Sequence, residues 1–229
     1  MNKTWVILPV LAFFCLSASA QVIPRRFIRS FGEGTVSATP DQAKIQFSVV
    51  TQAVTAEAAA AQNATQVTTL LAALRSVLGP NAELKTLSYS LNPNYSSPRD
   101  GSQPIILGYT ASNTVEATVT DLALIGKLID TGIQAGGNRV QGLRFGLKDD
   151  QPQRQQALKL ATAQAKAHAD AMASGLNLKT GAVVSIQEGS VVSPVLSFDA
   201  RALAAPSTPI ETGQVDVHAT VTLEVDLTQ

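Results

Sequence analysis

Two glycines near the start of the chain, Gly32 and Gly34, have the spacing that begins a phosphate-binding loop. They lie in the stretch FGEGTVSATPDQAKIQFSVV, residues 31–50. A dinucleotide loop needs a strand before the glycines and a third glycine that opens a helix. Here a turn at residues 38–41 and then a strand follow, so the stretch fails both requirements. We expect Gly32 and Gly34 to permit a bulge or a close backbone approach at a strand start.

The only two histidines, His168 and His218, do not form a metal-binding pattern. Zinc catalysis needs about three protein ligands, and no HExxH or similar spacing occurs. The G-x-S-x-G elbow of serine hydrolases and the EF-hand loop are also missing. Asp149 and Asp150 precede a predicted helix, whose N-terminus their charge complements. We therefore expect no catalytic residue, no cofactor and no metal site.

The 229 residues include 17 basic and 17 acidic side chains, so the formal net charge is zero. Nucleic-acid binding needs an excess of positive charge, which argues against nucleic acid as a partner. Aromatic residues make up 5% of the chain and leave few platforms on which bases or sugars could stack. The composition indicates a globular chain, long enough for one domain or two small ones.

Residues 1–20, MNKTWVILPVLAFFCLSASA, have the layout of a secretory signal peptide. Lys3 charges the first part, an apolar run extends from Trp5 to Leu16, and Ala18-Ser19-Ala20 suits the protease. We expect cleavage after Ala20 and export to the periplasm or the extracellular space. An uncleaved anchor is the alternative, because Lys3 is the single charge before the run and arginines follow the cut closely.

The only cysteine, Cys15, lies within this apolar run. After cleavage the chain has no thiol, so it can form neither a disulfide nor a cysteine–metal site. Phe13 and Phe14 stand where a lipoprotein signal has small residues, which argues against lipid attachment. No second apolar run is long enough to cross a membrane as a helix. The exported chain is thus expected to have no integral membrane span.

Apolar periodicity predicts strands that alternate with three amphipathic helices. The helices are predicted at residues 55–80, from Asp121 to Gly136-Gly137, and at 152–176. The strands are predicted around residues 35–37, 43–51, 87–91, 105–120, 140–147, 182–188 and 215–227. The inner faces of the second and third helices are predicted to be Leu122, Ile125, Ile129 and Ile133, and then Leu158, Ala161, Ala165, Ala169, Met172 and Leu176.

Several of the strand connections are hairpins, so the fold class is α+β rather than a doubly wound parallel sheet. We predict a mostly antiparallel β-sheet with three amphipathic helices packed on it. Residues 21–30 form an N-terminal arm, and residues 31–229 form one domain. Residues 92–104 form a loop, and the long connection at 189–213 is rich in Pro, Ser and Ala. Its scattered apolar residues suggest docking on a partner or on its own domain.

Asn113 falls on the apolar face of the strand at residues 105–120. It could contact a ligand, and it is the one candidate site residue in the chain. The alternative is a buried amide that neighbouring backbone groups satisfy. The carboxylates Asp216, Glu224 and Asp226 share the outer face of the last strand and are expected to form a solvated edge.

The ordered set of these segments resembles the SIMPL-domain family, a bacterial domain of unknown function. The matching stretches are GEGTVSATPDQA (32–43), LKTLSYSLNPNY (84–95), GYTASNTVEATVTDL (108–122), GGNRVQGLRFGLKD (136–149), ALKLATAQAKAHADAMASGL (157–176) and GAVVSIQE (181–188). The resemblance implies an exported α+β protein of the cell envelope, associated with stress tolerance, whose members in some cases assemble into large symmetric oligomers. The family has no agreed catalytic residues, so none are carried over.

Three hypotheses for function follow. The first is a non-enzymatic envelope protein that acts through homo-oligomerisation or through binding of another envelope protein. The second is a periplasmic module that binds a small ligand or a peptide, near Asn113 or along an exposed edge strand. The third is a hydrolase with an unrecognised site. We expect the first, because the chain has no catalytic constellation and residues 189–213 carry scattered apolar side chains.

Overall fold

The fold comes from a computed structural model, which describes residues 25–97, 103–189, 196–197 and 210–229. The predicted signal peptide and most of the connection at 189–213 lie outside the described residues. The elements, in chain order, are β1 (Phe27–Ala38), β2 (Gln42–Ala53), α1 (Ala56–Leu78), β3 (Leu84–Tyr95), β4 (Ile106–Val119), the 3₁₀ helix η1 (Leu122–Leu124), α2 (Ile125–Gln134), β5 (Arg139–Gly146), α3 (Gln151–Gly175), β6 (Lys179–Glu188), β7 (Leu196–Ser197) and β8 (Gln214–Thr228).

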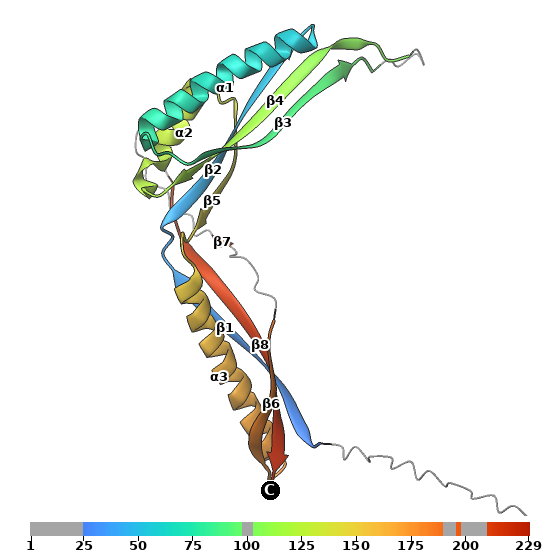
Figure 1. Cartoon of the computed structure of the whole chain (residues 1–229), viewed down its shortest axis with the longest axis vertical. Coiled ribbons are helices and arrows are strands. Elements are labelled where there is room, and N and C mark those ends of the chain that lie inside the picture. Colours follow the sequence, from blue (N-terminus) through green and yellow to red (C-terminus); the bar gives the residue numbers. More distant parts are fainter. Residues whose placement is uncertain (1–24, 98–102, 190–195, 198–209) are drawn as a thin grey trace, which may run out of the picture.

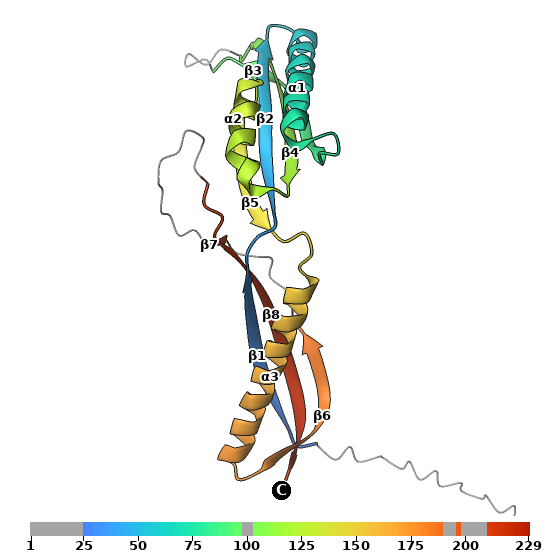
Figure 2. The same ribbon diagram turned by 90° about the vertical axis from the view of Figure 1, so that its left-hand side faces the viewer.

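Two antiparallel sheets form an elongated molecule, one toward each end (Figure 1). One sheet has the strand order β3-β4-β2-β5, and α1 and α2 lie side by side on one of its faces (Figure 2). The other has the order β1-β8-β6, with β7 also paired to β8, and α3 lies along it. We call these parts the α1–α2 half and the α3 half. The α+β class and the mostly antiparallel pairing are confirmed.

The first and last strands of the described chain pair along their whole length. Phe27 lies opposite Asp226, and Ala38 lies opposite Val215. In β8 buried residues alternate with half-buried ones at the predicted period, since one face packs inward and the other is partly open to water. Strand β1 begins at Phe27, inside the segment 21–30 predicted as an arm, because Ile28 and Ser30 are buried in the same alternation.

The two halves are joined by two short connections. Residues 39–41 lead from β1 to β2, and residues 147–150 lead from β5 to α3. Asp41 holds the two connections together, because its backbone N–H donates to the carbonyl of Gly146 at 3.1 Å and its Oδ1 accepts from the backbone N–H of Lys148 at 2.6 Å. Val215, at the start of β8, packs with the core of the α1–α2 half, so the halves also share apolar contacts.

Helix α1 begins and ends as its sequence predicts. The Oγ1 of Thr55 accepts a hydrogen bond from the backbone N–H of Ala58 at 3.2 Å. Gly79 ends the helix with φ of 91°, a conformation that favours glycine. The buried face of α1 covers β2 and β4, where Ile45, Phe47 and Val49 are fully buried. These residues form the core of the α1–α2 half.

The predicted inner faces of α2 and α3 are partly wrong. Ile133 of α2 is exposed, and Leu128 and Gly132 are buried with Ile125 and Ile129. Met172 and Leu176 near the end of α3 are exposed as well. The buried face of α3 consists of alanines at every fourth position: Ala157, Ala161, Ala165, Ala169 and Ala173. Larger side chains at these positions would not fit between α3 and β1, because the main chain of α3 packs closely against the main chain of β1.

Strand β3 is longer than its sequence predicts. The predicted loop at 92–104 begins in fact after Tyr95, because residues from Asn92 to Tyr95 remain paired with β4. Pro93 lies within β3, opposite Tyr109. A proline cannot donate to a ladder, but it is tolerated in a strand at the edge of a sheet, where β3 lies.

Candidate interaction surface

Gly32 and Gly34 let α3 lie directly on β1. A Cβ atom at Gly32 would lie 2.1 Å from the carbonyl oxygen of Ala161 and 2.5 Å from the backbone nitrogen of Ala165. At Gly34 it would lie 2.1 Å from the carbonyl oxygen of Ala157. These are clashes with main-chain atoms that no rotamer change relieves. The predicted close backbone approach is therefore confirmed, and the glycines serve packing between a helix and a strand.

Side chains of α3 also cover the outer edge of β1. Gln164 accepts from the backbone N–H of Glu33 through Oε1 at 2.5 Å. The Nδ1 of His168 lies 2.8 Å from the carbonyl oxygen of Phe31. Because that oxygen can only accept, Nδ1 of His168 must donate. An edge strand normally presents such groups to another chain, so α3 closes this edge against strand pairing.

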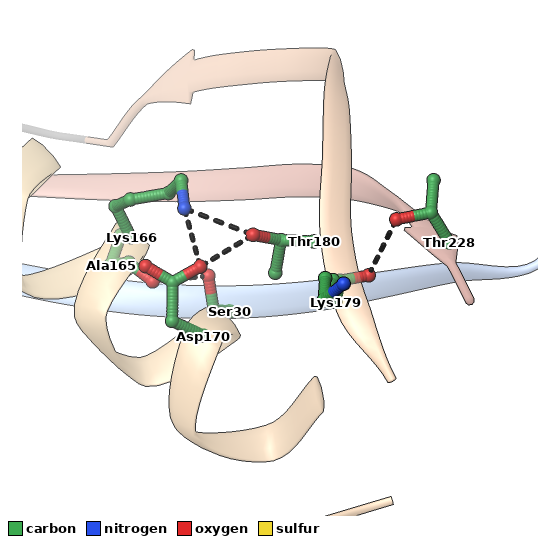
Figure 3. A network of polar contacts seen from close by, with 7 residues as sticks. All are labelled: Ser30, Ala165, Lys166, Asp170, Lys179, Thr180 and Thr228. Carbon is green, nitrogen blue, oxygen red and sulfur yellow. Dashed lines mark hydrogen bonds and ion pairs between the residues drawn. The ribbon is translucent and has the colours of Figure 1, made fainter. Parts of the chain in front are cut away.

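A polar network fastens α3 to β6 at the opposite margin of the same sheet (Figure 3). Lys166 and Asp170 form an ion pair one helical turn apart, and Thr180 of β6 donates to the Oδ1 of Asp170 at 2.5 Å. The Nζ of Lys166 also donates to Thr180 at 3.0 Å. The hydrogen bonds from Lys166 and then Thr180 hold the pKa of Asp170 below its usual value. Ser30 of β1 also binds α3, since it donates to the carbonyl of Ala165 at 2.7 Å.

The edge of β3 is open in the described part of the chain. Strand β3 pairs with β4 on one side and with no described strand on the other. Large apolar side chains with exposed fractions between 41% and 65% lie on β3 and at the adjoining start of β4. We call this set the β3 edge patch, and it comprises Leu87, Tyr89, Tyr95, Ile105, Ile106 and Leu107. Tyr95 lies opposite Ile106, so the patch continues from one strand to the other.

Two features limit how another strand could pair with β3. The register against β4 shifts between Thr86 and Ser88, which is a bulge, and Pro93 lacks an N–H. Between them, residues 88–92 keep a regular register against β4. Tyr89 stands in this regular stretch, next to its central residue, and is its one large exposed apolar side chain.

Asn113 lies in β4 between Val49 of β2 and Tyr89 of β3, on the apolar side of the strand as predicted. It is half-buried, and its Oδ1 is buried without a hydrogen-bond partner in the described residues. A contact of Asn113 with a ligand stays a prediction.

Asn63 of α1 is a second amide in this region, and the sequence did not lead us to predict it. It is 1% exposed. Its Nδ2 donates to the carbonyls of Val49 at 2.9 Å and Ala111 at 3.3 Å. Asn63 stands four residues before Val67 and so falls on the apolar stripe of α1. That position could have identified it, since an amide on such a stripe must find partners inside the fold.

His218, Asp216 and Asp149 have structural partners and are spread apart. On the outer face of the α3 half, Thr35 lies 2.9 Å from the Nδ1 of His218, and Ser37 donates to Asp216 at 2.6 Å. Asp149 accepts from the first N–H of α3, that of Gln151, at 3.0 Å, as its predicted position requires. Among the described residues, no three His, Cys, Asp or Glu side chains are grouped so that they could hold a metal ion.

Glu224 on the same outer face is bound from two neighbouring strands. The side chain of Arg29 donates to it at 2.7 Å, and Ser185 of β6 donates at 2.9 Å. These hydrogen bonds, that from Arg29 first, hold the pKa of Glu224 below its usual value. On this face Asp216 and Glu224 are thus engaged in cross-strand contacts, and the open β3 edge is the better candidate for an interaction.

The geometry defines an elongated α+β protein whose most distinctive surface is an open, apolar strand edge. Comparison with known families agrees with this architecture. Residues 28–225 match the family described as SIMPL, protein of unknown function (DUF541), and the chain belongs to this family.

Among its relatives is the 26 kDa periplasmic immunogenic protein of Brucella melitensis, which is 32% identical in an alignment of 212 residues that covers 86% of this chain and 82% of the relative. The uncharacterized protein YggE of Escherichia coli K12 is 27% identical over 173 residues, or 75% of this chain and 70% of the relative. None of the helices in the described ranges is both long enough and apolar enough to cross a membrane.

Proposed function

We propose that this chain is an exported, non-enzymatic protein of the cell envelope that works as a homo-oligomer, and that its copies associate through the β3 edge patch. The observation that carries the proposal is the open edge of β3, with Tyr89 exposed in its regular stretch. Tolerance of envelope stress, which the family resemblance implies, would then be a property of the assembly and its surfaces.

Several features favour a second copy of the chain as the occupant of this edge. An exposed strand edge with apolar side chains binds another strand through main-chain hydrogen bonds and through burial of those side chains. Two β3 strands related by a twofold axis would pair antiparallel, with Tyr89 of each near the middle. The formal net charge of zero means that copies approach without strong overall repulsion.

Contrast between the edges of the molecule also supports the choice of β3. The edge of β1 is covered by Gln164 and His168 of α3, whereas the regular part of β3 has no such cover in the described residues. Strand β6 is open too, but its two register shifts against β8, between Thr180 and Ser185, leave only residues 185–188 in a regular register, whereas the two shifts of β3 leave residues 88–94 regular between them. Repeated irregularities of this kind disrupt pairing with a further strand.

Export is the other part of the proposal. The N-terminal sequence has the layout of a signal peptide cut after Ala20. The Brucella relative is named a periplasmic protein, which supports the periplasm as the compartment of this chain.

The test is the mass in solution of the protein purified from the periplasm, measured by light scattering during size exclusion. We expect a discrete multiple of the monomer mass for the wild type. Tyr89→Lys places a positive charge within the proposed contact. Charged side chains protect natural edge strands from pairing with another strand, so this variant should shift the mass toward that of the monomer.

Leu176→Lys is the matched control, because it also replaces an exposed apolar side chain by lysine but lies at the end of α3. It should leave the mass unchanged. A wild-type protein that is monomeric at the highest concentration reached would contradict self-association. An oligomer that Tyr89→Lys leaves intact would show that the copies meet elsewhere.

A further inference from the structure

A pocket of about 270 Å³ lies at the end of the α1–α2 half that faces the α3 half. Its walls come from the end of α1, the segment before β3, the end of β4 and η1. The start of β2 adds Gln42, and the connection at residues 147–150 adds Lys148. Small-molecule sites usually measure about 300–1,000 Å³. A ligand of this pocket is therefore small.

The pocket combines an apolar wall with charges of both signs. Leu78 and Leu124 supply apolar surface, Glu83 and Asp121 supply carboxylates, and Lys148 supplies an ammonium group. Asp121 is partly engaged, since its Oδ1 accepts from the backbone N–H of Ala123 at 3.1 Å. The side chains of Glu83 and Lys148 make no hydrogen bond or ion pair with any described residue. Both charges are thus available to a ligand.

We infer that this pocket binds a small zwitterion, with an ammonium and a carboxylate group on a short apolar skeleton, as in a free amino acid. The ammonium group binds at Glu83 and Asp121, and the carboxylate binds at Lys148 through charge-assisted hydrogen bonds. The skeleton lies against Leu78 and Leu124. A ligand with one charge contacts only one of the two charged sides of the pocket, so the zwitterion binds more tightly.

The position of the pocket links binding to the connections between the halves. The Nε2 of Gln42 donates to the carbonyl of Leu147 at 2.7 Å, and the backbone N–H of Lys148 donates to Asp41. A ligand held by Lys148 therefore contacts the segment that fixes α3 to the α1–α2 half. The inference does not depend on self-association through β3, because none of the pocket residues belongs to the β3 edge patch.

The experiment is titration of the periplasmic protein with three probes that share a branched carbon skeleton, followed by NMR or calorimetry. L-leucine carries both charges, isoamylamine carries only the ammonium group, and isocaproate carries only the carboxylate. We expect saturable binding of L-leucine with a dissociation constant of about 1 mM or tighter. Each single-charge probe should bind about tenfold more weakly or worse, since it loses one charge-assisted hydrogen bond.

Two variants assign the contacts, and both replaced side chains are exposed, so the fold should remain intact. Glu83→Gln should weaken L-leucine and isoamylamine about tenfold and leave isocaproate unchanged. Lys148→Met should weaken L-leucine and isocaproate and leave isoamylamine unchanged. Lys159→Met on α3, outside the pocket, is the matched control and should bind all three probes as the wild type does.

Absence of saturable L-leucine binding would overturn the inference. So would binding that neither Glu83→Gln nor Lys148→Met weakens, because the ligand would then lie outside this pocket. Equal affinity for L-leucine and isoamylamine would overturn the assignment of a carboxylate to Lys148. A monomeric protein that still binds L-leucine in this way would refute the proposed assembly and support the pocket.

Discussion

At the scale of single residues, Gly34 shows how a small sequence feature determines the position of a whole helix. Its missing side chain leaves room for the main chain of α3, and Gly32 does the same one helical turn away. Alanines of α3 then fill the interface at every fourth position. An interior of this kind, made of main-chain atoms and methyl groups, is close-packed and has no side chain that can move aside.

We expect Gly34→Ala to destabilise the fold by an amount at the upper end of the about 1–3 kcal/mol typical of overpacked cores. The added Cβ would lie 2.1 Å from the carbonyl oxygen of Ala157, so α3 must move away from β1. The free energy of unfolding in urea measures the effect.

Gly175→Ala is the matched control, because a Cβ there has no atom within 4 Å. Alanine is the better helix former, so this variant should be as stable as the wild type or more stable by up to about 1 kcal/mol. An equal loss of stability in both variants would mean that contact with α3 is not what requires glycine at position 34.

At the scale of elements, a feature is predicted correctly from the sequence where neighbouring residues cause it. A feature whose cause lies far along the chain is missed. The cap at Thr55 and the alternation in β8 follow from neighbouring residues, and both are confirmed. The exposure of Met172 could not be predicted, because α3 is pressed against β1, more than a hundred residues earlier. Asn113 follows from its place as a polar residue on an apolar face, and Asn63 could have been predicted in the same way from its place on the apolar stripe of α1.

The network that fastens α3 to β6 predicts a dependence of stability on pH. Hydrogen bonds from Lys166 and Thr180 lower the pKa of Asp170 in the folded chain, so its ionised form favours folding. This contribution is complete above the unfolded pKa of about 3.9 and is lost as the pH falls through the lowered pKa of the folded chain. Asp170→Asn removes it.

The free energy of unfolding of wild type and Asp170→Asn should therefore differ most near neutral pH and converge in acid. Urea unfolding over a series of pH values measures the difference. Thr180→Val is the control, because it keeps the ion pair between Lys166 and Asp170 and removes only the two hydrogen bonds of the Thr180 hydroxyl, one to Asp170 and one from Lys166. Its effect should be smaller with the same sign. A difference between wild type and Asp170→Asn that stays constant with pH would contradict this account.

At the scale of the whole molecule, two small sheets act as one elongated body because three kinds of contact cross between them. Val215 packs into the core of the α1–α2 half, the chain passes from one sheet to the other at residues 39–41, and Asp41 binds the second connection. The described part of the chain begins and ends together at the far end of the α3 half (Figure 1). The β3 edge patch thus lies away from the point where the N-terminal segment leaves the fold.

Asp41 is the residue on which the relative position of the halves should depend most. Its Oδ1 accepts from Lys148 at 2.6 Å, a partner 107 residues later in the chain. Asp41→Ala removes this bond to a carboxylate, and the connections should become looser. Spin labels are attached to cysteines introduced by Ser76→Cys in α1 and Ser174→Cys in α3. We expect a broader distribution of the distances between the two labels, measured by pulsed electron paramagnetic resonance. The only native cysteine, Cys15, lies in the predicted signal peptide and would not take up label after cleavage.

Asp41→Asn is the control for this measurement, since its amide oxygen can still accept from Lys148 while its charge is gone. It should give the narrow distribution of the wild type. If Asp41→Ala gives the narrow distribution too, the apolar contacts of Val215 alone are enough to hold the halves. If both variants broaden it, the negative charge of Asp41, and not only its acceptor oxygen, fixes the connection. Only broadening by alanine with retention by asparagine agrees with a hydrogen bond that joins the two sheets into one body.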